Sequence, residues 1–90
     1  MSVPERKRAT ALHYGPSQDA PKVVATGQGV IADRILEIAA AAGVPIREDE
    51  ALANALASLE LGQEIPEDLF VAVAEALAWA YRLDRAARGT

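Results

Sequence analysis

The stretch "APKVVATGQGVIADRILEIAAAAGVPI", residues 20–46, decides the fold predicted for this chain. Its first part, Lys22–Thr26, is rich in β-branched residues and predicts a buried strand. The Gly-Gln-Gly sequence at 27–29 then ends the strand, and a helix is predicted over residues 30–42. Gly43 stands where a helix commonly ends in a left-handed residue. The stretch is therefore predicted as a strand, a turn and a helix.

The predicted helix has an apolar face and a charged face, and a short strand follows it. The apolar positions recur at helical spacing and are Ile31, Ile35, Ile38 and Ala42. The charged side chains gather on the opposite side and are Asp33, Arg34 and Glu37. Val44–Arg47 is predicted as a strand, with Pro45 near its start, where a missing N–H does least harm.

Segments on either side of this stretch supply the remaining elements. Ala9–Tyr14 alternates in the manner of a strand, and the turn-forming residues 15–21 connect it to the next strand. Asp49 suits the N-cap of a helix that ends at Gly62, and its apolar seam is Leu52, Leu56 and Leu59. Pro66 suits the first position of a last helix, whose predicted buried stripe is Leu69, Phe70, Val73, Leu77, Ala80 and Tyr81.

The elements follow one another as strand, strand, helix, strand, helix, helix. This order predicts an α/β fold in which a small mixed β-sheet of about three strands is covered by three helices, with one parallel pair joined by a right-handed crossover. Residues 9–83 form the folded domain in this prediction. Residues 1–8 precede it as a flexible basic leader, and residues 84–90 follow it as a frayed C-terminal tail.

Length and composition restrict the classes of function. The 90 residues carry a net charge of −4, with no cysteine and one histidine, which excludes thiolate metal sites and disfavours zinc. No apolar run is long enough to cross a membrane, so a soluble intracellular protein without a cofactor is expected. Glu48–Glu75 holds eight acids and no Lys or Arg, which argues against nucleic acid as a partner. This acidic stretch either solubilises the protein or docks a basic protein.

Three features invite a chemical role and have a structural interpretation as well. The turn at 27–29 can cradle a phosphate, but it lacks the third glycine of a dinucleotide site and the lysine of a P-loop, so a tight turn is favoured. His13 has no evident nucleophile or orienting carboxylate and is interpreted as a half-exposed strand residue. The adjacent acids at 48–50 are explained by helix capping and the helix dipole. We expect no catalytic residue.

Trp79 is the more informative candidate. It falls on the flank of the last helix's apolar stripe, where its ring either covers the margin of the core or anchors another protein. Val71 faces outward on the same helix, and Glu75 lies one turn before the tryptophan. These three residues are the candidate partner contact.

Several strings of the sequence are similar to one known family. They are "ALHYGPSQDAPKVVATGQG" at 11–29, "AGVPI" at 42–46 and "LELGQEIPEDLFVAVAEALAWAYRL" at 59–83. Together they resemble the cytoplasmic C-terminal domain of the FlhB/YscU/EscU family, the export-switch proteins of flagellar and type III secretion apparatus. The resemblance covers about residues 9–83.

The resemblance implies a self-cleaving Asn-Pro-Thr-His motif just before the first strand. In that family the Asn side-chain amide attacks its own main-chain carbonyl, and the chain breaks before Pro. Alignment through "ALHY" places Pro4, Glu5, Arg6 and Lys7 at this position, and the only asparagine of the chain is Asn54. The motif is therefore degenerate, and no self-cleavage is expected.

By resemblance, the chain is a non-catalytic binding and regulatory module of the export apparatus, located in the cytoplasm and peripheral to the inner-membrane export gate. The implied partners are proteins: the membrane part of FlhB, other export components, a hook-length or needle-length ruler, or substrates. The sheet edge near Ala9–Tyr14 would accept a strand from the missing membrane partner. No nucleic acid is expected among the partners.

Two alternatives stay open on the sequence alone. An enzyme or small-ligand binder would use the turn from Gly27 to Gly29, and phosphate titration would then produce saturable changes confined to Gly27–Ile31. The other alternative is a soluble fragment of a longer membrane protein, although the start at Met1 favours a native short chain.

Overall fold

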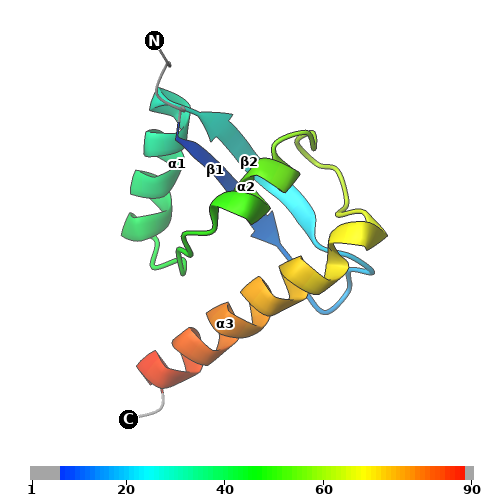
Figure 1. Cartoon of the computed structure of the whole chain (residues 1–90). Helices are drawn as coiled ribbons and strands as arrows, with labels where there is room; N and C mark the ends of the chain where they lie inside the picture. The colour runs from blue at the N-terminus through cyan, green and yellow to red at the C-terminus, as the bar shows by residue number, and fades with distance from the viewer. Residues whose placement is uncertain (1–6, 89–90) are drawn as a thin grey trace.

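The computed structural model describes residues 7–88 of the chain. Its elements, in chain order, are β1 (Arg8–His13), β2 (Lys22–Gln28), α1 (Val30–Ala41), α2 (Glu50–Leu56), the 3-10 turn η1 (Glu67–Leu69) and α3 (Phe70–Arg88). Figure 1 shows a two-stranded sheet with helices around it, and α3 as a long helix crossing one end of the sheet. The predicted α/β fold is confirmed.

The two strands form an antiparallel hairpin with a bulge. Leu12 lies opposite Val23 and Ala11 opposite Ala25, so Val24 of β2 has no opposite residue. An extra residue of this kind bends its strand and strengthens the local twist. The bulge leaves Leu12 and Val23 on a common face of the hairpin, where both contact the core.

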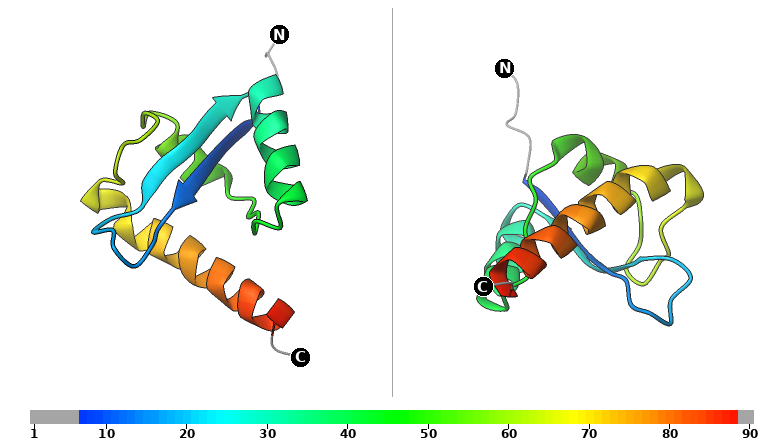
Figure 2. Two further views of the ribbon diagram at one scale, coloured as in Figure 1. Left: turned by 180° about the vertical axis from the view of Figure 1, so that it is seen from behind. Right: turned by 90° about the horizontal axis from the view of Figure 1, so that it is seen from below.

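Helices cover both faces of the hairpin. On one face, Ala9 is buried and α1 lies against both strands, with its Ala32 fully buried. On the other face, Leu12 and Val23 pack against side chains from α2 and α3. Figure 2 shows the strands between α1 on one side and α2 on the other. The buried cluster on this second face consists of Val23, Leu56, Leu59, Ile65 and Val73.

The predicted strand Val44–Arg47 is wrong, because this segment pairs with no strand within residues 7–88. The end of α1 explains the difference. Gly43 has φ +75°, and the N–H groups of Gly43 and Val44 donate to carbonyls of the last helical turn, as in a Schellman motif. Since Val44 has used its N–H and Pro45 has none, the segment lacks donors for a ladder. The predicted parallel pair and crossover are therefore wrong as well.

A different segment completes the edge of β2. Gly62 donates its N–H to the Val23 carbonyl at 2.7 Å, and Val23 donates to the Gln63 carbonyl at 3.0 Å. The chain must leave the helical path to make these bonds, so α2 ends at Leu56 and the predicted end at Gly62 is wrong. Burial of Leu59 and Ile65 on the way supplies the apolar contacts that favour this path.

The buried face of α1 differs from the predicted one. Ala32 is fully buried, whereas Ile31 and Ile38 are 60% and 58% exposed. Ala32 faces the sheet with Ile35 and Leu36 half-buried beside it, so the helix lies close to the strands at this alanine. The predicted apolar face of α1 is therefore only half used, which leaves apolar side chains on the surface.

Helix α3 is buried on one side of its first half. Val73 is 1% exposed and Leu77 packs against the core cluster, as predicted, but Phe70 and Tyr81 of the predicted stripe are exposed. Figure 1 shows the second half of α3 extending beyond the sheet. The helix continues to Arg88, five residues past its predicted end at Leu83.

Gly27 allows α1 to approach β2, which gives a first prediction. A Cβ atom at this position would overlap Cγ2 of Ile31 and lie 2.9 Å from its Cβ. We expect Gly27→Ala to lower the free energy of unfolding by about 1–3 kcal/mol through overpacking, measured by urea denaturation. The Gly27→Ala/Ile31→Ala pair should lose less than the sum of the two single changes. Additive losses would show that the two residues do not meet.

The two valines at the start of α3 give a second, internally matched prediction. Val73→Ala removes two buried methyl groups from the core cluster and should lower the free energy of unfolding by about 1.5–3 kcal/mol. Val71→Ala removes the same groups from a side chain that is 75% exposed and should change it by about 0.5 kcal/mol or less. Equal losses in urea denaturation would contradict the burial pattern of α3.

Candidate functional site

The turn at 27–29 is built for tight packing and not for an anion. Gly29 has φ +59° at the N-cap of α1, and its N–H donates to the Lys7 carbonyl at 2.7 Å. Asp33, in the first turn of α1, places Oδ1 3.0 Å from Lys7 Nζ. A used N–H and a carboxylate at this helix start disfavour phosphate, so the ligand-binding alternative is not favoured.

The polar residues singled out in the sequence do not converge. His13 is exposed at the end of β1, and its carbonyl accepts a hydrogen bond from Gln18 Nε2 at 3.1 Å. Asp49 accepts from the Leu52 N–H at 3.0 Å, which confirms it as the N-cap of α2. Within the part of the chain that the structure describes, no three His, Asp or Glu side chains are grouped so as to hold a metal ion.

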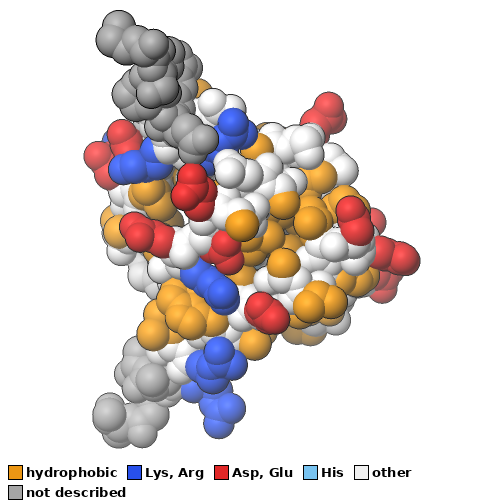
Figure 3. Space-filling model, viewed as in Figure 1, with side chains coloured by type: hydrophobic (Ala, Val, Ile, Leu, Met, Phe, Trp, Pro, Cys, Tyr) orange, Lys and Arg blue, Asp and Glu red, His pale blue; other side chains and the backbone are white. Residues whose placement is uncertain are grey.

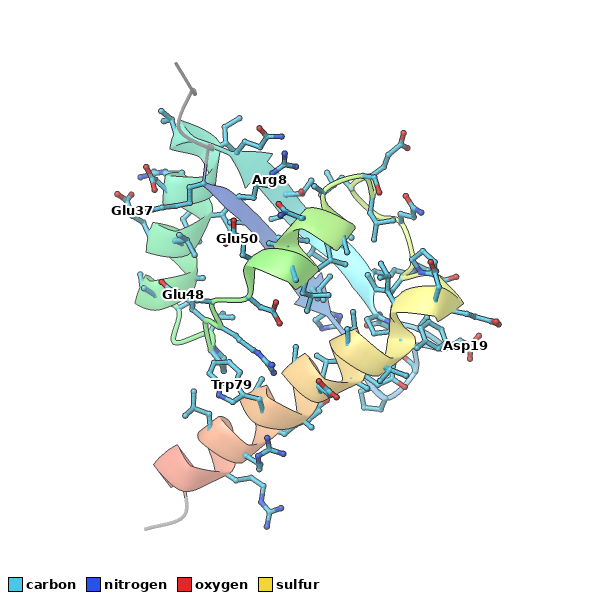
Figure 4. The ribbon with its side chains drawn as sticks, in the orientation of Figure 1. Arg8, Asp19, Glu37, Glu48, Glu50 and Trp79 are labelled. Carbon is cyan, nitrogen blue, oxygen red and sulfur yellow. The ribbon has the colours of Figure 1, made fainter. Side chains whose placement is uncertain are left out.

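The acids beside Asp49 point away from one another. Figure 4 shows Glu48 and Glu50 projecting from the start of α2 and Glu37 projecting from α1. Arg47 Nη2 lies 3.8 Å from Asp49 Oδ2, and both side chains are about one-third exposed. Acid–base chemistry needs a positioned pair around a substrate, and these side chains provide no such pair.

Of the degenerate cleavage-motif position, Pro4, Glu5 and Arg6 lie outside the described residues. Lys7 is described, and it directly precedes β1. Its carbonyl accepts from Gly29 and its ammonium group contacts Asp33. The backbone at Lys7 is therefore held at the junction of β2 and α1.

The outer edge of β1 is the most distinctive backbone feature of the molecule. The sheet has the order β1-β2, so no strand within residues 7–88 pairs with this edge. Because Gly29 bonds to Lys7 and hydrogen-bonded pairs alternate along an antiparallel ladder, Arg8 and Thr10 fall in the non-hydrogen-bonded pairs. Their N–H and C=O groups point away from β2, in the geometry that accepts another strand.

The predicted contact of Trp79, Glu75 and Val71 forms one row along α3, because the three residues are four positions apart. Val71 and Glu75 are exposed, whereas Trp79 is half-buried. Figure 4 shows Trp79 where α3 passes beside the segment that joins α1 to α2. The indole therefore covers the margin of the fold and keeps an exposed edge, so both roles foreseen for it are compatible with its position.

The surface separates charges along α3 and carries many apolar side chains. Figure 3 shows acidic side chains near the start of α3 and Lys or Arg side chains near its far end, with apolar side chains between them. The exposed large apolar residues on α1 and the segment after it are Val30, Ile31, Ile38, Val44 and Ile46. Exposed apolar side chains of this size make this part of the molecule a candidate for binding another protein.

Sequence reasoning missed two parts of this surface. Only one local feature of the sequence indicates the pairing of Gly62 and Gln63 with β2. This feature is Gly62 itself, which adopts φ +83°. The helical spacing of the isoleucines of α1 predicts a core position for them, because an apolar stripe alone does not tell which flank of a helix faces the sheet. No helix of the described chain has both the length and the apolar character needed to span a membrane.

Comparison with known proteins shows which family has similar sequences. Residues 6–80 match the model of the "FlhB HrpN YscU SpaS Family". The chain is 43% identical over 83 residues to "Uncharacterized protein YlqH" of Bacillus subtilis, covering 91% of this chain and 89% of that protein. It is 51% identical over 79 residues to "Flagellar biosynthetic protein FlhB" of Salmonella typhimurium, covering 86% of this chain but 21% of FlhB.

A solved structure agrees with the fold. The cytoplasmic domain of FlhB from Shewanella putrefaciens superimposes with a TM-score of 0.85 at 35% identity, covering 91% of this chain and 69% of that domain. The resemblance that the sequence motifs indicated is thus confirmed at the level of family and fold. The chain belongs to the FlhB, HrpN, YscU and SpaS family.

Proposed function

We propose that this chain is a protein-binding and regulatory module of a flagellar or type III export apparatus, and that it works by docking without catalysis. Family membership and the names of the relatives support the apparatus. Within residues 7–88 no strand pairs with the outer edge of β1, and this observation carries the docking mechanism. Its place of work is the cytoplasm, at the inner-membrane export gate.

The β1 edge fits a partner segment in extended conformation. Strand addition takes its affinity from main-chain hydrogen bonds, and Arg8 and Thr10 offer two donors and two acceptors for them. The proposed donor is the membrane part of FlhB, since this chain spans only about a fifth of FlhB.

A second contact lies on α3. The half-buried Trp79 offers a large apolar contact area with an exposed edge, and aromatic residues of this kind often dominate interface energy. Val71 and Glu75 are exposed and lie in the same row of the helix, two turns and one turn before the tryptophan. Together with the acidic residues between Glu48 and Glu75, they favour other export components, a length ruler or export substrates with basic surfaces.

We expect no self-cleavage, because the degenerate motif lacks the asparagine that would act as the nucleophile. Asn54 is the only asparagine of the chain, and it lies exposed within α2, far along the chain from the degenerate motif. Pro4, Glu5 and Arg6 offer no side-chain amide that could attack a main-chain carbonyl. The module therefore keeps its chain intact and contributes through its surface.

The β1 edge leads to a third prediction. Thr10→Pro removes one outward N–H and leaves the β1–β2 ladder intact, because proline is tolerated where an edge N–H faces solvent. We expect about a tenfold or greater loss of affinity for membrane FlhB that lacks its own cytoplasmic part, from the loss of a hydrogen bond and the steric block. Affinity is measured by co-purification in detergent and by the emission of the single tryptophan.

Thr10→Val is the matched control for this experiment. It keeps the β-branched shape and the N–H while removing the hydroxyl that lies 3.5 Å from Thr26 Oγ1. Circular dichroism of both variants shows whether they fold. Equal binding by folded Thr10→Pro and Thr10→Val proteins would contradict strand addition at β1, and no binding by the unmodified chain to any gate component would contradict the proposed function itself.

The fourth prediction is that the chain remains uncleaved. Because no asparagine stands at the degenerate motif, the mass of the purified protein should remain that of the full chain during prolonged incubation at neutral pH, as recorded by mass spectrometry. Appearance of a fragment that begins within residues 4–7 would contradict the non-catalytic assignment.

A further inference from the structure

The outward face of α3 is a second unpartnered surface. Val73 is 1% exposed and Val71 is 75% exposed, although only one residue separates them in the sequence. Two helical positions correspond to a rotation of about 200°, so Val71 marks the side of α3 directly away from the core. Ala74, Ala78 and Tyr81 are also exposed on this outward half of the helix.

Charge is distributed unequally along the same face. The first half of α3 and the turn before it carry Glu67, Asp68 and Glu75, and the second half carries Arg82 and Arg85. All five side chains are exposed. The ion pairs found within the described part of the chain are made by other residues and do not involve α3. These five exposed side chains make no ion pair with another described side chain, and we take them as available to a partner.

We propose that this face pairs with the same face of a second copy, as an antiparallel pair of α3 helices. Antiparallel pairing brings the acidic half of each helix to the arginine half of the other, whereas parallel pairing would set like charges together. With Ala78 at the two-fold axis, Glu75 lies beside Arg82 of the second copy, and the contact occurs twice by symmetry. The small Ala78 side chains allow the helices to approach.

The geometry of the body permits this arrangement. The core lies on the Val73 side of α3, so the two domains sit on opposite sides of the helix pair and do not collide. A helix of 19 residues is about 28 Å long, and a single pair of such helices covers less than the roughly 1,200 Å² of a standard stable interface. The dimer is therefore weak and depends on protein and salt concentration.

Disulfide trapping tests the register directly, since the chain has no cysteine. Ala78→Cys places two thiols near the two-fold axis, within reach of the short Cβ–Cβ distance that a disulfide needs, and should cross-link about tenfold faster than a control. Ala41→Cys is the control, an alanine that is likewise exposed on a helix but lies on α1. Equal rates for the two variants would overturn the proposal.

Charge reversal tests the pairing without a cross-link. Glu75→Arg or Arg82→Glu should each raise the dimer dissociation constant about tenfold, because each creates two like-charge contacts across the axis. The combined Glu75→Arg/Arg82→Glu variant should restore it. Sedimentation equilibrium at up to about 1 mM protein covers this affinity class, and circular dichroism checks the fold of each variant.

Three outcomes would overturn the proposal: a monomer at every concentration, single reversals without effect, or a double reversal as weak as the single ones. The inference does not rest on the proposed function, because neither experiment contains an export component. A chain that dimerises through α3 but binds no gate would overturn only the proposed function. A monomer that binds the gate would overturn only this one.

Discussion

The hydrogen bonds on the two edges of β2 are the constraint on which the rest of the structure depends. One edge pairs with β1, and the other exchanges bonds with Gly62 and Gln63 at the level of Val23. The Val23 side chain is fully buried in the cluster that also holds Val73. A single strand therefore joins the hairpin, the turn after α2 and the start of α3. Without this junction the cluster that α3 covers would lose its fully buried central valine.

Local signals in the sequence predicted the elements whose causes are local. The β-branched run at 22–26 forms a strand, Gly43 ends α1 in a left-handed conformation and Asp49 caps α2 through the Leu52 N–H. The failures lie where distant segments compete for the same groups. Val44–Arg47 has strand-like composition, but the helix cap takes its donor. Residues 57–62 have helical composition, but the edge of β2 draws them out of the helix.

The candidate site divides in the same way. Motif reasoning set aside the turn at 27–29 and His13, because the sequence around them lacks the residues that a dinucleotide or P-loop motif and a catalytic histidine require. It could not place the open backbone edge of β1 or the exposed isoleucines of α1, since these are properties of how strands and helices are arranged. Function therefore entered through the resemblance of whole segments to one family. The geometry then indicated which surfaces are free to act.

The junction at Val23 also determines how the molecule opens under native conditions. The hairpin and α1 are joined by short connections. The bonds from Val23 to Gly62 and Gln63 instead close a loop of many residues, and closing a longer loop costs more conformational entropy. Local unfolding should therefore release the segment from the end of α2 through α3 before it disturbs the hairpin. In amide hydrogen exchange, the helix that carries the only tryptophan would form a separate, less protected cooperative unit. Detachment of this unit would also expose the Val23 face of the sheet without breaking the strand pair.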